Sequence, residues 1–178
     1  MAGILWTSSY KSPLGDLLLV ADDIGLVGVW FSKEKYFAEN STLKHQEAEL
    51  SVFEKAKKWF DAYFSGVVPK TYVPLHFTGT KFQNEVWQLL CDVPYGEVIT
   101  YGGIAKKIAE KCGLKYMSAQ AVGGAVGSNK ISIIVPCHRV IGAKGNLTGY
   151  AGGMDKKIFL LNLEKSYKEN FFMPKKSV

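Results

Sequence analysis

Apolar residues recur along the chain with two different spacings. Two short apolar runs in residues 17–31 flank the turn-forming sequence 22–25, which predicts a β-hairpin with a positive φ angle available at Gly25. In residues 46–64 the apolar positions recur every three or four residues, which predicts an amphipathic helix. The first part of the chain is therefore predicted to contain strands followed by a helix.

Glycine and proline residues interrupt this pattern in residues 66–80, which we interpret as a linker between two small domains. Beyond it, Thr80, Thr100 and Ser118 each precede an apolar stripe with helical spacing, so each is a candidate N-cap. The second and third of these helices are short and closely spaced, which predicts a helix-turn-helix.

The third of these helices, from Ala119 to about Val126, is built almost entirely from small residues, among them Gly123 and Gly124. Glycine costs a helix up to about 1 kcal/mol per residue relative to alanine. Two explanations stay open: the helix approaches another surface closely, such as a DNA groove, or it packs tightly against another helix.

The β-branched run 131–135 predicts a short buried strand or extended segment that leads directly into Pro136 and Cys137. A glycine-rich loop follows at 142–153, and residues 155–164 have the pattern of a final helix. The charged segment after this helix is expected to fray.

These patterns predict an α+β fold. Residues 1–78 would form a small N-terminal α/β domain with an antiparallel sheet and a helix. Residues 79–165 would form a mostly helical domain that contains the helix-turn-helix, and residues 166–178 a charged tail.

Charge also distinguishes the two halves of the chain. Of the 22 basic residues one is an arginine, Arg139, and the formal net charge is +6. Residues 1–79 carry a net charge of −1 and residues 80–178 a net charge of +7, so the second half is the expected partner-facing half. A basic surface suits a polyanion such as nucleic acid. A single arginine, however, provides little bidentate recognition of guanine or phosphate.

The three cysteines are odd in number and widely spaced, so they do not indicate a disulfide framework. The three histidines are scattered and lack the paired Cys or His spacing of zinc ligands, so no metal site is expected. The sequence contains no apolar run of membrane-spanning length and no signal-peptide pattern at its start. We expect a soluble protein of a reducing compartment without a membrane partner.

Cys137 and His138 form the candidate reactive pair. Adjacent side chains of an extended strand point to opposite faces, so a direct contact between the two needs a bend or a bridging water. A histidine oriented by a third group can accept the thiol proton. The alternative is an inert buried cysteine, which we favour for Cys91 and Cys112.

The sequence around this pair resembles the O6-alkylguanine-DNA alkyltransferases, also called methylated-DNA–protein-cysteine methyltransferases. The resemblance extends over roughly residues 8–165, including an N-terminal domain of the ribonuclease H-like type. The motifs that carry it are Ser12-Pro13-Leu14-Gly15, Phe82-Gln83-x-x-Val86-Trp87, Pro94-Tyr95-Gly96-Glu97-x-x-x-Tyr101, Ala121-Val122-Gly123-Gly124-Ala125, Asn129, Pro136-Cys137-His138-Arg139-Val140 and Gly149-Tyr150-Ala151-Gly152-Gly153.

The resemblance implies a single-turnover repair reaction without a cofactor. Cys137 would take the alkyl group from O6 of guanine, and from O4 of alkylated thymine, in double-stranded DNA and keep it as a thioether. Glu164 would orient His138, which would act through a water on Cys137. Asn129 would brace the active-site turn, and Tyr101 would donate a proton or hydrogen bond to N3 of the departing guanine.

The resemblance further implies that a monomer flips the damaged base out of the duplex from the minor groove. It would work in the cytoplasm, with the nucleoid in a prokaryote, or in the nucleus in a eukaryote. The implied DNA-binding residues are Ser118, Gln120, Ala121, Gly123 and Lys130. The implied pocket residues are Ser132, Val140, Tyr150, Ala151 and Gly152, with structural roles for Pro136 and Arg139.

The chain departs from the family pattern at two positions. Gln120 stands where the family commonly has an arginine that enters the base stack, so we expect weaker affinity for duplex DNA. Ser132 stands where some members have proline, which leaves more room for larger alkyl groups. Residues 1–79 also lack the Cys/His cluster of relatives that bind zinc in this domain.

Three other functions are weighed against alkyl transfer. A non-enzymatic damage-binding protein of the same fold is disfavoured because such relatives have lost the cysteine. A cysteine hydrolase is disfavoured because its Cys and His are usually distant in sequence. A plain basic DNA-binding module leaves Tyr101, Asn129 and Glu164 unexplained.

Overall fold

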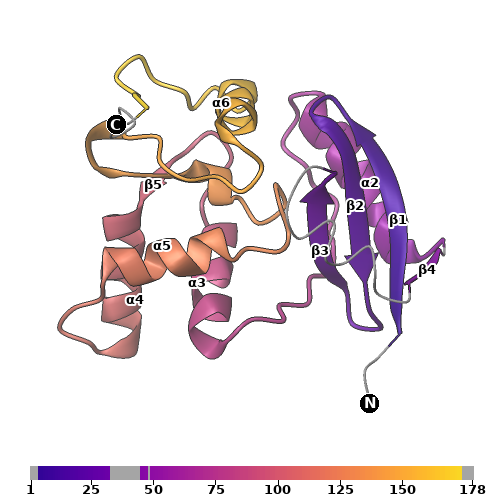
Figure 1. Ribbon diagram of the computed structural model, residues 1–178, viewed down its shortest axis with the longest axis horizontal. Helices are drawn as coiled ribbons and strands as arrows, with labels where there is room; N and C mark the ends of the chain where they lie inside the picture. The colour runs from indigo at the N-terminus through magenta and orange to yellow at the C-terminus, as the bar shows by residue number, and fades with distance from the viewer. Residues whose placement is uncertain (1–3, 33–44, 48, 174–178) are drawn as a thin grey trace. The chain divides into compact units, whose positions relative to one another are not determined.

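The computed structural model describes residues 4–32, 45–47 and 49–173. The chain divides into two compact units (Figure 1). Unit 1 comprises Met1–Thr78 and Lys130–Ser132, and unit 2 comprises Gly79–Asn129 and Ile133–Val178. Within the described ranges, no helix is long and apolar enough to cross a membrane.

Unit 1 is built on a four-stranded sheet with the strand order β3-β2-β1-β4. The strands are β1 (Leu5–Ser12), β2 (Gly15–Ala21), β3 (Leu26–Phe31) and β4 (His45–Glu47). The first three are antiparallel neighbours, and β4 pairs in parallel with β1. The predicted antiparallel sheet and its hairpin are therefore confirmed.

Gly25 lies in the hairpin turn between β2 and β3, but the predicted positive φ angle is not the reason that glycine is required there. Gly25 is not among the residues with a positive φ angle. A Cβ atom there would lie 2.7 Å from the carbonyl oxygen of Pro74, so the close approach of the neighbouring backbone requires glycine. The turn itself is fixed by Asp22, whose Oδ1 accepts hydrogen bonds from the backbone of Ile24 and Gly25.

One helix, α2 (Ser51–Phe64), covers a face of this sheet (Figure 1). Its aromatic residues pack on β1, where the Tyr10 ring stacks near those of Phe60 and Phe64. The predicted helical start at residue 46 is wrong. Residues 45–47 belong to β4, and Leu50 is still extended, because pairing with β1 overrides the local helical spacing.

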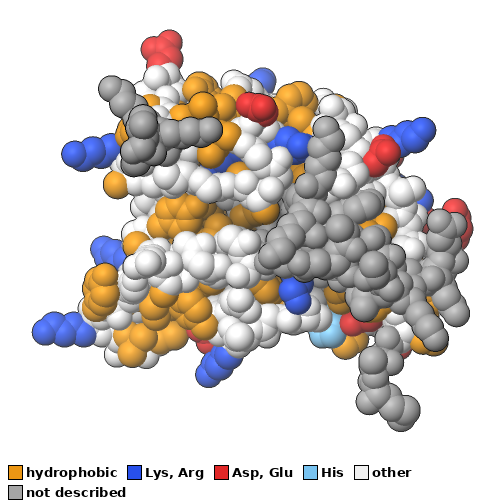
Figure 2. Space-filling model, in the orientation of Figure 1, with side chains coloured by type: hydrophobic (Ala, Val, Ile, Leu, Met, Phe, Trp, Pro, Cys, Tyr) orange, Lys and Arg blue, Asp and Glu red, His pale blue; other side chains and the backbone are white. Residues whose placement is uncertain are grey.

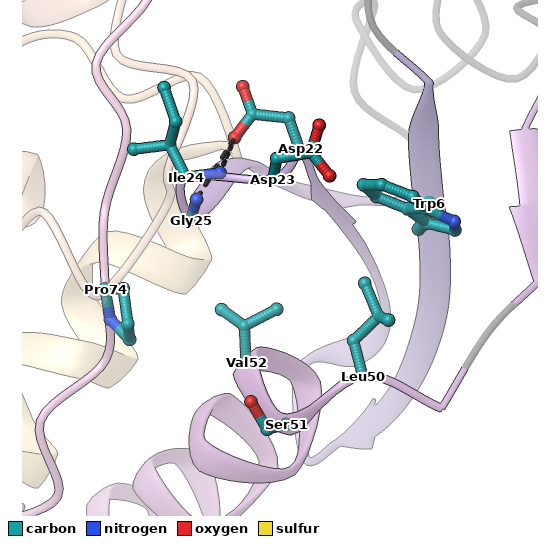
Figure 3. A pocket seen from close by; sticks show the side chains of 9 residues that line it. All are labelled: Trp6, Asp22, Asp23, Ile24, Gly25, Leu50, Ser51, Val52 and Pro74. Carbon is teal, nitrogen blue, oxygen red and sulfur yellow. Dashed lines mark hydrogen bonds between the residues drawn. The ribbon is translucent and has the colours of Figure 1, made fainter.

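Part of the predicted linker is bound to unit 1. Leu26 donates a backbone hydrogen bond to Pro74, and His76 donates one to Leu26, so this segment lies along β3. A cavity of about 390 Å³ lies where this segment, the hairpin turn and the start of α2 meet. Figure 3 shows the side chains that line it. Its lining residues are Trp6, Asp22, Asp23, Ile24, Gly25, Leu50, Ser51, Val52 and Pro74.

Unit 2 is mostly helical. Its elements are α3 (Lys81–Cys91), β5 (Ile99–Thr100), α4 (Tyr101–Cys112), α5 (Ala119–Gly127), the 3-10 turns η1 (Cys137–Arg139) and η2 (Ala143–Gly145), β6 (Val140–Ile141) and α6 (Met154–Leu163). The short strands β5 and β6 pair in parallel. The α4–α5 pair is the predicted helix-turn-helix, and its packing on α3 includes a hydrogen bond from Trp87 Nε1 to the Ala125 carbonyl.

All three predicted N-caps are confirmed. Thr80, Thr100 and Ser118 each accept a hydrogen bond from the backbone N–H three residues further on. At Thr80 the Gln83 side chain also binds back to the cap backbone, which completes a capping box. The starts of these helices are therefore determined by short-range sequence signals.

Residues 131–135 are mostly buried, as predicted, but they form neither a strand nor a continuous extended segment. Ile131 makes a single parallel bridge to Val29 within unit 1, and Ile133 then adopts a φ angle of 71°. A left-handed conformation costs a bulky residue about 1–3 kcal/mol, so the surrounding structure must impose it. The chain turns at Ile133 as it passes from unit 1 to unit 2.

The segment after α6 does not fray over its described residues 166–173. Phe171 is buried in a cluster with Ile141, Leu147 and Leu161. Phe172 exchanges backbone hydrogen bonds with Gly145 and Leu147, which extends the packing of this segment. One buried aromatic side chain, Phe171, and the backbone hydrogen bonds of Phe172 thus hold a segment whose charge predicted exposure.

Candidate active site

The backbone bends sharply immediately before Cys137. Pro136 has φ −81° and ψ 61°, and the Cys137 N–H donates to the Val135 carbonyl at 2.8 Å, which is the geometry of an inverse γ-turn. The 3-10 turn Cys137–Arg139 follows at once. The bend that a Cys–His pair requires is therefore present, and proline favours it because its ring fixes φ near this value.

Cys137 is buried, with 7% of its surface exposed, and contacts Asn129. Asn129 Nδ2 lies 3.2 Å from Cys137 Sγ and 3.1 Å from the Val135 carbonyl oxygen. The amide thus binds the sulfur and the carbonyl that begins the turn. A hydrogen-bond donor aimed at sulfur favours the thiolate over the thiol.

The sulfur lies at a cavity of about 250 Å³, which we call the active-site cavity. Residues from α4, α5, the active-site turn and the glycine-rich loop surround it. They are Tyr101, Gly123, Val126, Gly127, Asn129, Cys137, Gly149, Tyr150 and Ala151. Two of the five predicted pocket residues, Tyr150 and Ala151, line this cavity.

The other three predicted pocket residues lie elsewhere. Ser132 is buried in unit 1, where its N–H donates to the Val29 carbonyl, a bond that proline could not make. Val140 is buried in β6, paired with Ile99. Gly152 belongs to the loop but is not part of the cavity wall.

Behind Cys137, three side chains form a buried cluster, which we call the ion-pair cluster: His138, Arg139 and Glu164. Glu164 is the C-cap of α6, and His138 Nε2 lies 2.7 Å from its Oε1. Arg139 donates to both carboxylate oxygens and, through Nη1, to the Val93 carbonyl. The structure therefore brings together the predicted histidine, carboxylate and arginine.

Burial, hydrogen bonds and neighbouring charges determine the protonation states of Glu164 and His138. Burial raises the pKa of Glu164, but hydrogen bonds from His138 and Arg139 outweigh it and lower this pKa to about 2. Burial lowers the pKa of His138, and the opposing effect of Glu164 does not compensate. At neutral pH the carboxylate can accept but not donate, so His138 Nε2 carries the proton and Nδ1 is the acceptor of the ring.

Tyr101, the first residue of α4, also lines the active-site cavity. Its hydroxyl donates to the Thr148 carbonyl at 3.3 Å. Burial, followed by the charge of Cys137, raises the pKa of Tyr101, so the phenol keeps its proton at neutral pH. It can therefore act as a proton or hydrogen-bond donor inside the cavity.

Several small residues of α5 face outward. Ala121, Gly124 and Gly127 are exposed, as is Gln120, whereas Ala125 is buried and Gly123 lines the active-site cavity. A Cβ atom added at Gly124 or Gly127 would meet nothing within 4 Å, so packing inside the unit does not require glycine there. Of the two explanations left open by the sequence, close approach of an external surface is favoured over helix packing.

Figure 2 agrees with this description of α5. Where Figure 1 places this helix, the surface consists mainly of backbone and small uncharged side chains, and lysines stand at the edges of the unit. Ser118 serves as the cap of α5. Lys130 lies in unit 1 instead, where its ammonium binds the hydroxyl of Thr78 at 3.1 Å.

Sequence reasoning missed one charged residue of the site, Lys157. Its side chain is fully buried, and its ammonium binds three backbone carbonyls. A signal was available, because Lys157 precedes the buried Leu160 and Leu161 by three and four residues and so shares their face of α6. No group of three or more His, Cys, Asp or Glu side chains in the described ranges is arranged to hold a metal ion.

This geometry suits nucleophilic chemistry, because one cysteine faces a cavity beside a histidine that an ionised carboxylate orients. The class so defined is that of proteins that act through a single activated cysteine. Family models agree and specify it further. The ribonuclease-like domain of 6-O-methylguanine DNA methyltransferase matches residues 5–77, and the DNA-binding domain of the same family matches residues 81–166.

Individual relatives support the same assignment. Methylated-DNA–protein-cysteine methyltransferases from Haemophilus influenzae and Methanosarcina acetivorans are both 44% identical to this chain. The matches cover 90% and 91% of this chain and 87% and 99% of the relatives. The chain belongs to the 6-O-methylguanine DNA methyltransferase family.

Solved structures of the family have the same fold. The crystal structure of Mycobacterium tuberculosis O6-methylguanine methyltransferase is 39% identical, with a TM-score of 0.76, and the match covers 92% of this chain and 94% of that one. A crystal structure of the Mycobacterium tuberculosis protein in complex with DNA is 40% identical, also with a TM-score of 0.76, over 89% of this chain and 91% of that one.

Proposed function

We propose that this protein repairs DNA by moving the alkyl group of O6-alkylguanine, and of O4-alkylthymine, onto Cys137. The observation that carries this proposal is the position of Cys137 Sγ, which lines the active-site cavity and accepts a hydrogen bond from Asn129. The family assignment supplies the substrate class, because relatives that match about nine-tenths of this chain are named methylated-DNA–protein-cysteine methyltransferases.

The reaction is a displacement at the alkyl carbon. The Cys137 thiol loses its proton through a bridging water to His138, whose Nδ1 is the ring's acceptor once Nε2 binds Glu164. The thiolate then attacks, so the C–S bond forms as the bond between carbon and O6 breaks. The electron pair of that bond leaves with guanine, and the product thioether has no route back to a thiol.

Tyr101 assists the departing base. A guanine that leaves as an anion is a poor leaving group unless a donor neutralises its charge at N3. The phenol of Tyr101 lines the same cavity as Cys137 and keeps its proton at neutral pH. We assign to it the proton or hydrogen bond that the base takes up.

Access to the alkyl carbon requires that the nucleotide leave the base stack, because this carbon is out of reach in a duplex. The exposed side of α5 is the proposed contact with the minor groove, since Ala121, Gly124 and Gly127 let the backbone approach closely. Gln120, at the exposed start of α5, is the proposed residue that fills the gap left by the flipped base.

The division of labour follows the two units. Residues 79–165 carry DNA binding and alkyl transfer, residues 1–78 support them, and residues 166–178 form a tail that packs on unit 2 at least as far as Phe172. The protein acts as a monomer where its DNA is, in the cytoplasm of a prokaryote or the nucleus of a eukaryote.

The test uses a duplex oligonucleotide that carries one O6-methylguanine. After incubation, mass spectrometry of the digested protein is expected to find one methyl group per molecule, on the peptide that contains Cys137, without turnover. Cys137→Ser should abolish transfer. Cys112→Ser serves as the matched control, because Cys112 is an exposed thiol outside the cavity, and should transfer normally.

The same experiment separates alkyl transfer from the rival function. A damage-binding protein of this fold would retain the methylated duplex in a gel-shift assay and leave Cys137 unmodified. Methyl transfer to Cys137 excludes that function, and tight binding without transfer would replace our proposal with it.

A further inference from the structure

Lys157 is a charged side chain that the proposed reaction leaves without a role. It lies on α6 with 0% of its surface exposed. Its ammonium donates to the carbonyl oxygens of Val140 at 2.6 Å, Thr148 at 3.1 Å and Gly149 at 3.2 Å. An ammonium has three N–H donors, so these three carbonyls use its full capacity.

The three carbonyls belong to two segments of the active site. Val140 is in β6, directly after the turn that holds Cys137. Thr148 and Gly149 begin the loop whose next residues, Tyr150 and Ala151, line the active-site cavity. Lys157 therefore ties the cavity loop to the strand that follows the nucleophile.

The same loop is also bound to α4. The Thr148 carbonyl accepts from Lys157 and also from the Tyr101 hydroxyl. Two donors from α4 and α6 thus meet on one backbone carbonyl, which fixes the loop between the nucleophile and the proposed proton donor.

Burying an ammonium is costly, and a role in packing alone does not account for it. Among the described residues no carboxylate pairs with Lys157, so carbonyl dipoles alone offset its desolvation. An apolar side chain of similar length would fill the same space at lower cost. Burial lowers the pKa of Lys157 to about 8, while the charge of Cys137 acts in the opposite direction, so thiolate and ammonium favour each other.

We propose that Lys157 is a positioning residue for the proposed alkyl transfer: its buried ammonium holds the cavity loop on β6 and favours the thiolate form of Cys137. This inference rests on the proposed function for its significance. Its electrostatic part concerns Cys137 itself and can be measured without DNA.

Other charged and titratable groups of the site also influence Cys137. Tyr101 lines the same cavity and is neutral at neutral pH. Within the ion-pair cluster, Glu164 favours protonation of His138, whereas Arg139 and Lys157 oppose it. Lys157 and Arg139 are the positively charged groups of this set. The charge of Arg139 is paired with the carboxylate of Glu164, whereas Lys157 binds carbonyl oxygens.

The experiment measures how fast iodoacetamide alkylates Cys137 as a function of pH, in a Cys91→Ser, Cys112→Ser background that leaves one thiol. Lys157→Met removes the charge and the tether, and Lys157→Gln removes the charge but keeps an amide that can donate to two carbonyls. We expect both to raise the midpoint of the pH profile by about one unit, a roughly tenfold slower reaction on its low-pH side.

Lys156→Met is the matched control, because it removes one positive charge from the neighbouring position of the same helix. Its midpoint should stay at the wild-type value, since long-range charge effects are screened. Folding of each variant is verified by its thermal transition, and Lys157→Gln carries the test if Lys157→Met does not fold. A fall in rate by the same factor at every pH, with an unmoved midpoint, would overturn the proposal.

The tether has its own readout in alkyl transfer. With the thiolate fully formed at high pH, Lys157→Gln should transfer a methyl group from DNA faster than Lys157→Met, because it can still hold part of the loop. Equal rates at high pH would contradict the tether. If neither the wild type nor any variant transferred methyl groups, the proposed function would be wrong. The iodoacetamide measurement would still report the effect of Lys157 on the Cys137 thiolate.

Discussion

Arg139 binds Glu164 through two parallel hydrogen bonds inside unit 2. Its Nε lies 2.8 Å from one carboxylate oxygen and its Nη2 lies 3.0 Å from the other. A guanidinium can make this forked contact, whereas an ammonium cannot. The only arginine of the sequence is therefore used inside the protein to hold the carboxylate that orients His138.

Replacement of this arginine by lysine should be costly although the charge is kept. Arg139→Lys loses the forked contact with Glu164. The lysine side chain is also shorter, so the hydrogen bond to the Val93 carbonyl should be weakened or lost. We expect the free energy of unfolding, measured by urea denaturation at pH 7, to fall by about 1–3 kcal/mol. Equal free energies of unfolding for the wild type and Arg139→Lys would show that the forked contact with Glu164 does not contribute to stability.

Glu164 should make stability depend on pH in the acid range. Its pKa is lowered from the ordinary value of 4.5 to about 2 by His138 and Arg139, which outweigh burial. The ionised form therefore stabilises the fold above pH 4.5, and this stabilisation, about 3 kcal/mol, is lost as the pH falls towards 2. Urea denaturation at several pH values between 2 and 7 measures it.

The matched controls are Glu164→Gln and Glu97→Gln. The first should be less stable at pH 7, because it leaves the buried charge of Arg139 without its carboxylate, and should lose most of the acid-range dependence. Glu97 is an exposed acid, so its replacement should leave the dependence intact. The same acid dependence in all three proteins would assign it to other carboxyl groups.

Several features of the fold could be predicted because their causes lie within a few residues. Thr80, Thr100 and Ser118 were identified as caps from one side chain and the stripe that follows it. The hairpin was identified from two apolar runs and a turn. The caps and the turn of the hairpin are stabilised by hydrogen bonds between residues at most a few positions apart, as at Asp22.

Features that depend on distant pairing could not be predicted in this way. Residues 45–47 form a strand because β1 offers a free edge, and Ile133 is left-handed because the chain must change direction there. Lys157 was missed because a lysine is ordinarily exposed. The role of Glu164 was predicted from the family resemblance alone. Its partner Arg139 lies 25 positions away, so no short-range sequence pattern relates the two residues.

Asn129 should influence the reactivity of Cys137 directly, because its amide donates to the sulfur at 3.2 Å. A hydrogen bond to a charged group contributes about 1.5–3 kcal/mol, so Asn129→Ala should slow methyl transfer by roughly 10- to 150-fold. Single-turnover rates on a methylated duplex measure this. Asn162→Ala removes an exposed asparagine on α6 and should transfer at the wild-type rate.

Gly124→Ala should separate stability from DNA binding. A Cβ atom there meets nothing within 4 Å, and alanine favours the helix, so thermal stability should rise, by up to about 1 kcal/mol. Affinity for duplex DNA should fall, because the added methyl group holds the groove away from the backbone of α5. Transfer from O6-alkylguanine supplied as the free base should be unchanged. A variant that gains stability and keeps its duplex affinity would place the DNA elsewhere.

Gln120 is the last residue whose proposed role can be tested by opposite substitutions. Gln120→Ala removes the side chain that is proposed to fill the gap left by the flipped base, so repair of a methylated duplex should slow while transfer from the free base continues. Gln120→Arg adds length and a positive charge and should bind duplex DNA more tightly, with a steeper dependence on salt concentration. Lys81→Gln, which removes a charge at the start of α3, controls for general electrostatics. If Gln120→Ala and Gln120→Arg both repair the duplex at the wild-type rate, the flipped state is stabilised by another residue.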